Sequence, residues 1–426
     1  MLSRLPRSNA AARGLWVRAK STAVSSVQEA VPLHKLEAAL GDTQEAARER
    51  KARIFGDAPG IPVEGSDFDS KAFYDQVYGT NCEQVVGFLT IPIGAIGPLV
   101  INGKEFQVPL ATTEGALVAS ANRGARAIRE AGGATSRVLR DGMTRSPVLS
   151  FPSIVEASEF ASWVSDPSRM EQLSEWFSTT TNFGQLRAVT PTVAGRYVYL
   201  RFEASTGDAM GMNMVGKGVN VVMEELLKVH SSATLVSLSS NMCTDKKPSA
   251  MNWVKGRGKS VVCEVVLSKE IVRNVLKTEI DALVQLNITK NLVGSALAGS
   301  IGGNNAHASN LVSAIYLATG QDPAQNVESS NCLVLMEPRN NGEELYVAVT
   351  MPSIEVGTVG GGTSLPVQRE CLSQLGVAGA HSSTPGANAR QLAEVVAATV
   401  LAGELSLNAA LTSNHLISAH MELNRK

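Results

Sequence analysis

The chain has 426 residues, 44% of them hydrophobic, and a formal net charge of −1 at pH 7. This length can bury a large core and favours two or three domains. The near-neutral charge disfavours a nucleic-acid-binding protein, which usually carries a basic excess. No uninterrupted apolar run reaches the length of a membrane span, because Glu404 interrupts the longest candidate, residues 395–410. We therefore expect a soluble protein.

The cysteines and histidines argue against a metal centre and against a disulfide framework. The five cysteines are an odd number and show no Cys-x-x-Cys spacing, which indicates a reducing compartment. The histidines form no His-x-x-x-His pattern, since His415 and His420 lie five residues apart. We expect no metal ion.

The N-terminal segment is basic. Five cations precede the first acidic residue, Glu29, and are interspersed with apolar residues, Ser and Ala: Arg4, Arg7, Arg13, Arg18 and Lys20. This composition is typical of a mitochondrial presequence, and the alternatives are a disordered basic tail or a cloning artefact. We expect residues 1–23 to be the presequence and the protein to be soluble in the mitochondrial matrix.

Residues 24–82 are charged and helix-prone, and we expect them to form an N-terminal helical subdomain. Residues 85–94 then predict a strand that ends at proline and glycine. Thr113 is a suitable N-cap for a following helix that stops near Gly132, and Glu114 would lie in its first turn. The inner face of this helix would carry Leu117, Ala121, Gly124, Ala125 and Ile128.

Between residues 147 and 236 the pattern is that of a small α+β domain. Apolar and polar residues alternate from Tyr197 to Glu203, which predicts a half-buried strand. A helix further on carries one apolar stripe, formed by Val215, Val219, Val222, Leu226 and Val229. Between them lies the run from Asp208 to Met214. A strand that leads through glycine into a helix N-terminus is a general anion site, although this methionine-rich run alone is more typical of core packing.

Small and apolar residues fill the segment from Asn291 to Gly303, which predicts a buried helix. His307 and Asn310 would face the same way on its continuation. Asp322 follows just after Gly320.

The turn at residues 245–248 (DKKP) is the most informative motif. Pro248 biases Lys247 away from helix, so we expect two lysines on a rigid turn, where an ammonium group can stabilise a developing oxyanion. A solvated surface turn is the simpler interpretation of this segment alone. Nucleotide fingerprints are missing, because no Gly-x-Gly-x-x-Gly occurs and Trp253 replaces the Walker glycine before Gly258-Lys259-Ser260.

Four further segments accompany this turn: residues 111–115 (ATTEG), 208–214 (DAMGMNM), 320–326 (GQDPAQN) and 415–425 (HLISAHMELNR). Together and in this order they closely resemble the catalytic portion of 3-hydroxy-3-methylglutaryl-coenzyme A (HMG-CoA) reductase in its class I form. The resemblance extends from about residue 28 to the end of the chain.

The resemblance implies an α+β fold. A large catalytic and coenzyme A-binding α/β domain would be built around a buried central helix from residues 83–146 and 249–426. A small ferredoxin-like α+β NADP-binding domain, residues 147–236, would be inserted in it. Residues 237–248 would form the connecting catalytic loop.

The implied reaction reduces HMG-CoA to mevalonate and coenzyme A with two NADPH and no metal. Each reduction leaves negative charge on a carbonyl oxygen, which requires a cation and a proton source. By resemblance, Lys246 is the cation, Glu114 supplies protons and Asp322 lies between them. His420 would protonate the departing coenzyme A thiolate.

The resemblance also assigns binding residues. Those for the substrate are Arg145, Ser239, Asn241, Asp245, Lys247, Lys290, His307, Asn310 and His34. Those for the cofactor are Asp208, Met210, Gly211, Met212, Asn213 and Asn182. Relatives have tyrosine at the position of His34 and arginine at that of Asn182, so we expect weaker adenine stacking and a weaker preference for NADPH. Lys426 replaces the serine of regulated relatives, so we expect no phosphorylation switch there.

Residues 83–88 correspond to the segment through which the family dimerises, which implies a homodimer or homotetramer with shared active sites. Two alternative functions stay open. One is NADH-linked oxidation of mevalonate, which the nicotinamide preference would distinguish. The other is a non-catalytic acyl-CoA-binding protein, which would need no acid paired with a lysine.

The presequence can be tested by fusing residues 1–28 to a fluorescent protein. We expect the fusion to enter mitochondria, because an acid-free cationic segment is attracted to the negatively charged import surface. Changing Arg4, Arg7, Arg13 and Arg18 to glutamate should leave the fusion in the cytosol. Fluorescence microscopy checks both outcomes, and a cytosolic unaltered fusion would contradict the prediction.

Overall fold

The computed structural model describes residues 31–41, 43–56, 73, 76–77, 80–81 and 89–413. The chain divides into an N-terminal unit, residues 1–68, and a second unit, residues 69–426. The N-terminal unit contains η1 (Leu33–Lys35), α2 (Leu36–Leu40) and α3 (Thr43–Phe55). Helical structure was expected here. The expected presequence, residues 83–88 and His420 lie outside the described residues.

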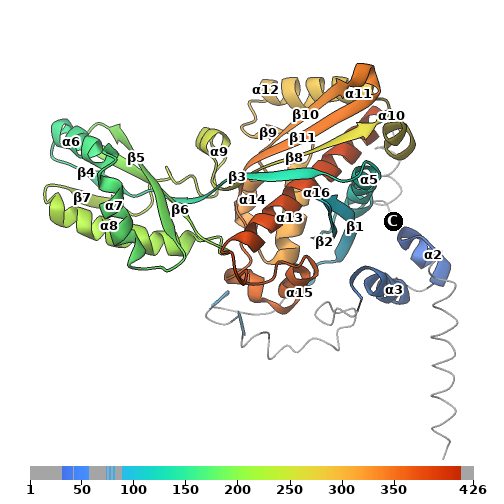
Figure 1. Cartoon of the computed structure of the whole chain (residues 1–426), viewed down its shortest axis with the longest axis horizontal. Helices are drawn as coiled ribbons and strands as arrows, with labels where there is room; N and C mark the ends of the chain where they lie inside the picture. Colours follow the sequence, from blue (N-terminus) through green and yellow to red (C-terminus); the bar gives the residue numbers. More distant parts are fainter. Residues whose placement is uncertain are drawn as a thin grey trace, which may run out of the picture. The chain divides into compact units, whose positions relative to one another are not determined.

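Within the described part of the second unit, the strands form two sheets (Figure 1). The smaller is an antiparallel pair, β1 (Ile93–Ile101) and β2 (Lys104–Ala111). The larger has nine strands: β3 (Thr135–Arg145), β4 (Val148–Ser150), β5 (Gln185–Ala194), β6 (Tyr197–Ser205), β7 (Thr234–Ser237), β8 (Gly258–Ser268), β9 (Gly303–Asn304), β10 (Cys332–Arg339) and β11 (Glu344–Ile354). Its order is β7-β4-β6-β3-β8-β11-β10-β9, with β5 paired to β6.

Within residues 89–413, the α-helices are α5 (Leu117–Glu130), α6 (Ile154–Ser165), α7 (Arg169–Ser178), α8 (Met212–Val229), α9 (Ala250–Lys255), α10 (Lys269–Ile271), α11 (Ile280–Leu286), α12 (Ser295–Leu297), α13 (Ala308–Thr319), α14 (Asn326–Ser329), α15 (Pro366–Gln374) and α16 (Ala387–Thr412). Shorter or differently wound segments are η3 (Val272–Leu276), η4 (Asn287–Gly294), η5 (Pro323–Gln325), η6 (Asn340–Gly342) and η7 (Gly361–Ser364). The expected α+β class is confirmed.

One long strand, β3, connects two hydrophobic cores. Its residues 135–142 pair with β8, and its residues 143–145 pair with β6. The smaller core lies among α6, α7, α8 and the strands β4 to β6, and the larger core surrounds α16. Figure 1 shows β3 running from one group of elements to the other. The strand therefore continues the sheet from the small domain into the large one.

The central helix α16 is long and apolar enough to cross a membrane by length and composition, but 78% of its most apolar window is buried inside the protein. Glu404 is the one charged residue of α16 that is fully buried. The Glu404 carboxylate accepts hydrogen bonds from the backbone nitrogens of Ala306 and His307, both at 2.8 Å. These two residues directly precede α13, so Glu404 fixes the start of that helix against α16.

Three local expectations are wrong. Thr113 is not an N-cap: α5 begins at Leu117 after Ala116, whose φ is 69°, so Glu114 lies before the helix. Val229 ends the apolar stripe of α8 with 54% of its surface exposed, because it lies in the last turn. The expected strand at residues 85–94 starts only at Ile93 within the described residues.

The segment from Asn291 to Gly303 is not a buried helix in this chain. It is divided between η4, α12 and β9, and Leu297 is 85% exposed. His307 is not on its continuation but is the N-cap of a separate helix, α13. Small apolar residues all around a helix do not reveal which face has a neighbour, and here part of that surface faces outward.

Two helical glycines provide a matched test of packing. A Cβ at Gly124 in α5 would collide with the backbone oxygen of Ala402 in α16, whereas a Cβ at Gly216 in α8 would lie 3.7 Å from Arg145. We expect Gly124→Ala to lower the free energy of unfolding by about 1–3 kcal/mol through overpacking. Gly216→Ala should raise it by roughly 0.5–1 kcal/mol through helix propensity. Denaturant titration measures both, and equal effects would contradict the close approach of α5 and α16.

Candidate active site

The predicted lysine turn is held in a strained conformation. Three non-glycine residues between 241 and 246 have a positive φ: 63° at Asn241, 63° at Thr244 and 55° at Lys246. The fully buried amide of Asn252 donates to the carbonyl oxygens of Thr244 at 2.9 Å and Lys247 at 3.1 Å. Such backbone angles persist only where surrounding contacts determine them. The turn is therefore rigid, in agreement with the expectation from Pro248.

Lys246 and Asp322 form an ion pair at the surface of this turn. The Lys246 ammonium nitrogen lies 3.0 Å from Asp322 Oδ2. The Lys246 side chain is 41% exposed and that of Asp322 is 34% exposed. The hydrogen bond to Asp322 is the largest cause that raises the pKa of Lys246. The other oxygen of Asp322 accepts from the backbone nitrogen of Ala324 at 3.0 Å. The pair keeps the ammonium group charged and fixes its direction.

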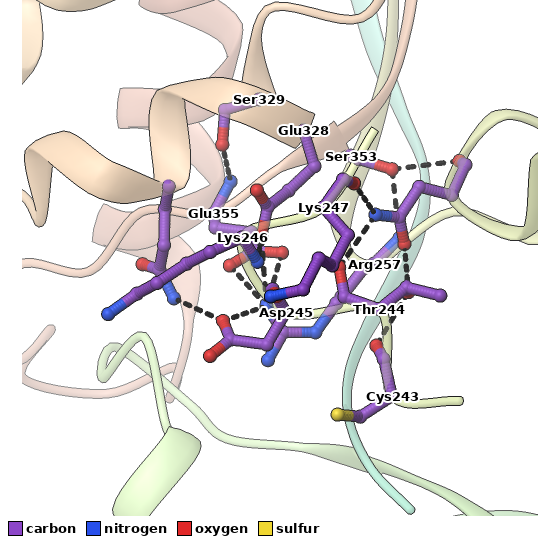
Figure 2. A network of polar contacts seen from close by, with 12 residues as sticks. Cys243, Thr244, Asp245, Lys246, Lys247, Arg257, Glu328, Ser329, Ser353 and Glu355 are labelled. Carbon is purple, nitrogen blue, oxygen red and sulfur yellow. Dashed lines mark hydrogen bonds and ion pairs between the residues drawn. The ribbon is translucent and has the colours of Figure 1, made fainter. Parts of the chain in front are cut away.

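Below the turn lies a cluster of buried charges (Figure 2). The Arg257 guanidinium is 0% exposed and lies 2.9 Å from Asp245, 3.2 Å from Glu328 and 2.5 Å from Glu355. Burial raises the pKa of Glu328, and it raises that of Glu355 well above its usual value. We name these four residues the Arg257 cluster. Its three carboxylates lie close enough to hold a metal ion, but the guanidinium already occupies their common centre.

The predicted cofactor residues gather at the N-terminus of α8. Gly211 precedes the helix with a φ of 94°, and a Cβ there would collide with the side chain of Thr206. No side chain caps the first turn, so its backbone N–H groups suit an anionic cofactor. The loop that carries Asn182 lies nearby, since a Cβ at Gly184 would meet Met214 Sδ at 3.0 Å. The residues present therefore fit a dinucleotide phosphate.

Gln325 connects this motif to the lysine turn. Its fully buried Nε2 lies 3.6 Å from Met210 Sδ, 3.4 Å from Met212 Sδ and 3.4 Å from Asp245 Oδ1. The family resemblance assigns no role to Gln325, although it lies only three residues after Asp322 in the motif at residues 320–326. Its contacts bring the predicted cofactor motif to the predicted catalytic turn.

Asp208 has a different environment from its neighbours in the motif. It is 6% exposed, and its two carboxylate oxygens accept backbone hydrogen bonds from His381 at 2.9 Å and Ala389 at 3.0 Å. Ala389 lies in the first turn of α16, where a negative charge is favourable. Asp208 thus connects the small domain to the large one, and its contact with a cofactor stays a prediction.

The predicted substrate residues form two groups. Arg145 ends β3, and Ser239, Asn241, Asp245 and Lys247 belong to the loop beside it. Thr144 Oγ1 donates to the backbone oxygen of Cys243 at 2.9 Å and joins β3 to this loop. In the second group, Lys290 donates to Asn291 at 3.0 Å, and burial lowers the pKa of Lys290.

The second group is completed by His307, the N-cap of α13, and by Asn310 in that helix, and it is organised by Glu404. Asn291 donates to Asn408 at 3.2 Å, and Asn408 donates to the carboxylate of Glu404 at 3.3 Å. Among residues 89–413, no described contact joins this group to the lysine turn or joins Glu114 to Lys246. Glu114 is exposed, and its backbone nitrogen donates to Thr112 Oγ1 at 3.0 Å. The role of Glu114, like those of His34 and His420, stays a prediction.

Residues 49–425 match the protein family described as hydroxymethylglutaryl-coenzyme A reductase. The chain belongs to this family. It is 54% identical over 396 residues to 3-hydroxy-3-methylglutaryl-coenzyme A reductase 1 of Dictyostelium discoideum, covering 92% of this chain and 71% of that protein. It is 52% identical over 405 residues to the Nicotiana sylvestris reductase, covering 94% of this chain and 66% of that protein. The chain thus spans about two thirds of the length of these relatives.

Solved structures of the family share the fold. The class II reductase of Streptococcus pneumoniae, bound to NADPH in open conformations, matches with a TM-score of 0.68 and 20% sequence identity. The match covers 88% of this chain and 99% of that one. The α+β architecture described above is therefore that of a hydroxymethylglutaryl-coenzyme A reductase.

The contacts of Asp208 predict the effect of Asp208→Asn. An asparagine can accept from only one of the two backbone nitrogens and presents its own N–H₂ group to the other, so one buried donor loses its partner. We expect a loss of about 1–3 kcal/mol in the free energy of unfolding. We also expect faster amide hydrogen exchange in residues 379–389. The exposed Asp281→Asn is the control, and an equally small effect at both positions would contradict the structural role of Asp208.

Proposed function

We propose that this protein reduces HMG-CoA to mevalonate and free coenzyme A, consuming two NADPH and two protons and releasing two NADP⁺. The observation that supports this most directly is the Lys246–Asp322 pair, which lies on a rigid turn connected through Gln325 to the N-terminus of α8. A cation beside a predicted dinucleotide site suits hydride transfer to a carbonyl group. The family membership supports the same reaction.

The residues of this chain would position the acyl group and control charge and protons. NADPH supplies the hydride when it is bound. Lys246 would stabilise the negative charge that develops on the carbonyl oxygen, and Asp322 would hold the ammonium group in place and keep it charged. Glu114 would supply the proton to that oxygen. His420 would protonate the coenzyme A thiolate, so that the aldehyde is released from the thiol before the second reduction.

The substrate carries a carboxylate at one end and phosphates at the other, and both need fixed positive charge. Arg145 and Lys247 lie beside the lysine turn and would bind the hydroxymethylglutaryl part, with Ser239 and Asn241 beside them. Lys290, with His307 and Asn310 beside it, would complete the binding of the hydroxymethylglutaryl part. The lowered pKa of Lys290 reflects its burial, and an anionic substrate group nearby would restore its preference for the charged form.

The preference for NADPH over NADH is expected to be modest. Asn182 is neutral and exposed, so another cation would have to bind the 2′-phosphate. Arg196 already donates to the backbone oxygen of Phe151 and lies over the ring of Tyr197. Arg187, which is exposed on β5, is therefore the better candidate on this domain.

The assembly and location of the enzyme are also proposals. We expect a homodimer or homotetramer with shared active sites. In such an assembly, the lysine turn of one subunit would meet Glu114 and the Lys290 group of another subunit. The basic segment at residues 1–23 supports import into the mitochondrial matrix. The mature enzyme would then act there as a soluble protein.

The decisive experiment is an assay of HMG-CoA-dependent NADPH and NADH oxidation by wild-type and Lys246→Ala enzyme. We expect Lys246→Ala to lower kcat by about 10²–10³-fold or more, because removing one group that stabilises an oxyanion in the transition state typically costs this much. Lys269→Ala, which removes a half-buried lysine paired with Glu343 at 2.7 Å, is the matched control and should leave kcat unchanged. Turnover of Lys246→Ala within tenfold of wild type would contradict the assigned role.

A further inference from the structure

One short segment of the chain contacts both the side-chain ammonium group and the backbone nitrogen of Lys246. Asp322 contacts the ammonium nitrogen at 3.0 Å, and Glu328, six residues later, accepts a hydrogen bond from the Lys246 backbone nitrogen at 2.8 Å. The segment between them contains η5 and α14. Asp322 is the partner implied by the family resemblance, whereas Glu328 is not among the residues that the resemblance assigns.

Glu328 does not act alone, because its carboxyl group contacts that of Glu355. Both side chains are 0% exposed, and both lie against the guanidinium of Arg257. Two buried carboxyl groups can share a hydrogen bond only when one of them is protonated. Burial raises the pKa of Glu355 well above its usual value, and more strongly than that of Glu328, so in a shared hydrogen bond Glu355 is the member that carries the proton and donates it to Glu328. Glu328 then remains ionised.

We propose that Glu328 is a positioning residue for Lys246: it acts as the ionised member of a buried carboxyl pair with Glu355, fixes the Lys246 backbone and supplies negative charge to its ammonium group. This inference rests on the proposed function of Lys246 as the catalytic cation.

The backbone of Lys246 needs such support. Its φ of 55° lies in the left-handed region, which costs roughly 1–2 kcal/mol for a residue with a Cβ. The hydrogen bond to Glu328 stabilises this conformation and fixes where the side chain leaves the turn. Without it, Lys246 would regain an ordinary backbone conformation, and its ammonium group would move away from Asp322.

The electrostatic effect has a defined sign. The hydrogen bond to Asp322 raises the pKa of Lys246 most, and the charges of Asp322, Asp245 and Glu328 raise it further, while burial lowers it. The titratable or charged groups that face the carboxyl pair are Arg257, Asp245, Lys246 and Tyr316. Removing the charge of Glu328 should therefore lower the pKa of Lys246, so that the ammonium group loses its proton at a lower pH.

The test uses full-length Glu328→Gln, which keeps a hydrogen-bond acceptor for the Lys246 backbone nitrogen, removes the charge, and places an amide N–H₂ group toward Glu355 in place of an accepting oxygen. The matched variant Glu355→Gln replaces a carboxyl group that is already neutral, and Glu343→Gln makes the same chemical change at a distant surface ion pair. Competitive acetylation of Lys246 across pH, read by peptide mass spectrometry, gives the pKa of its amine without requiring activity. The pH profile of kcat is measured in parallel.

We expect Glu328→Gln to lower the pKa of Lys246 by about half a unit or more and to move the basic limb of the kcat profile by the same amount. Its KM for NADPH should change little, because the cofactor motif is not touched. Glu355→Gln and Glu343→Gln should leave both the amine pKa and the basic limb within about 0.2 units of wild type. A folded Glu328→Gln with the wild-type pKa of Lys246 would overturn the proposal.

If Glu328→Gln does not fold, Glu328→Asp replaces it. The shorter carboxylate keeps the charge but reaches the Lys246 nitrogen less well, so we expect a lower kcat with an unmoved basic limb. A lowered pKa of Lys246 in this variant would also overturn the proposal. A wild-type enzyme that shows no HMG-CoA-dependent oxidation would refute the proposed function instead, and the acetylation titration would still decide the role of Glu328.

Discussion

The buried charge of Arg257 is the constraint on which the geometry of the site depends. Its guanidinium is fully buried, and an unpaired charge in such a place would be prohibitively costly. The carboxyl groups that surround it come from three segments: Asp245 lies in the lysine turn, Glu328 in α14, and Glu355 directly after β11. Two of these segments also carry Lys246 and Asp322. The ion pair at the surface is therefore positioned by the charges beneath it.

The same region joins the two domains. β3 continues the sheet of the large domain into the small one, and Asp208 ties the end of β6 to the start of α16. Gln325 contacts the methionines of the α8 motif and the carboxylate of Asp245. Each of these connections ends within a few residues of a predicted catalytic or cofactor residue. A hydride donor on the small domain and an acceptor on the large one would thus be held together by β3, by the hydrogen bonds of Asp208 and by the contacts of Gln325.

Local patterns in the sequence predicted the parts of this arrangement that have a local cause. Alternating residues predicted β6, the apolar stripe predicted α8, and Pro248 predicted a rigid lysine turn. The Arg257 cluster has no such local signal, because Glu328 lies 71 residues and Glu355 lies 98 residues from Arg257 in the sequence. The only hint was a lone arginine between two glycines before an apolar strand. The N-cap of α5 was also missed, because Ala116 takes a positive φ of 69°, a conformation that a residue with a Cβ rarely adopts.

Glu404 shows how a residue that merely interrupts a hydrophobic pattern can organise a site. In sequence it divides a long apolar run, and in the fold it is a fully buried carboxylate inside α16. It accepts from the backbone at the start of α13, where a negative charge is favoured, and from Asn408, which in turn contacts Asn291 beside Lys290. His307 is thereby bonded directly to this buried charge, and Lys290 is linked to it through Asn291 and Asn408. The predicted acyl-CoA residues thus depend on the central helix, just as Lys246 depends on Arg257.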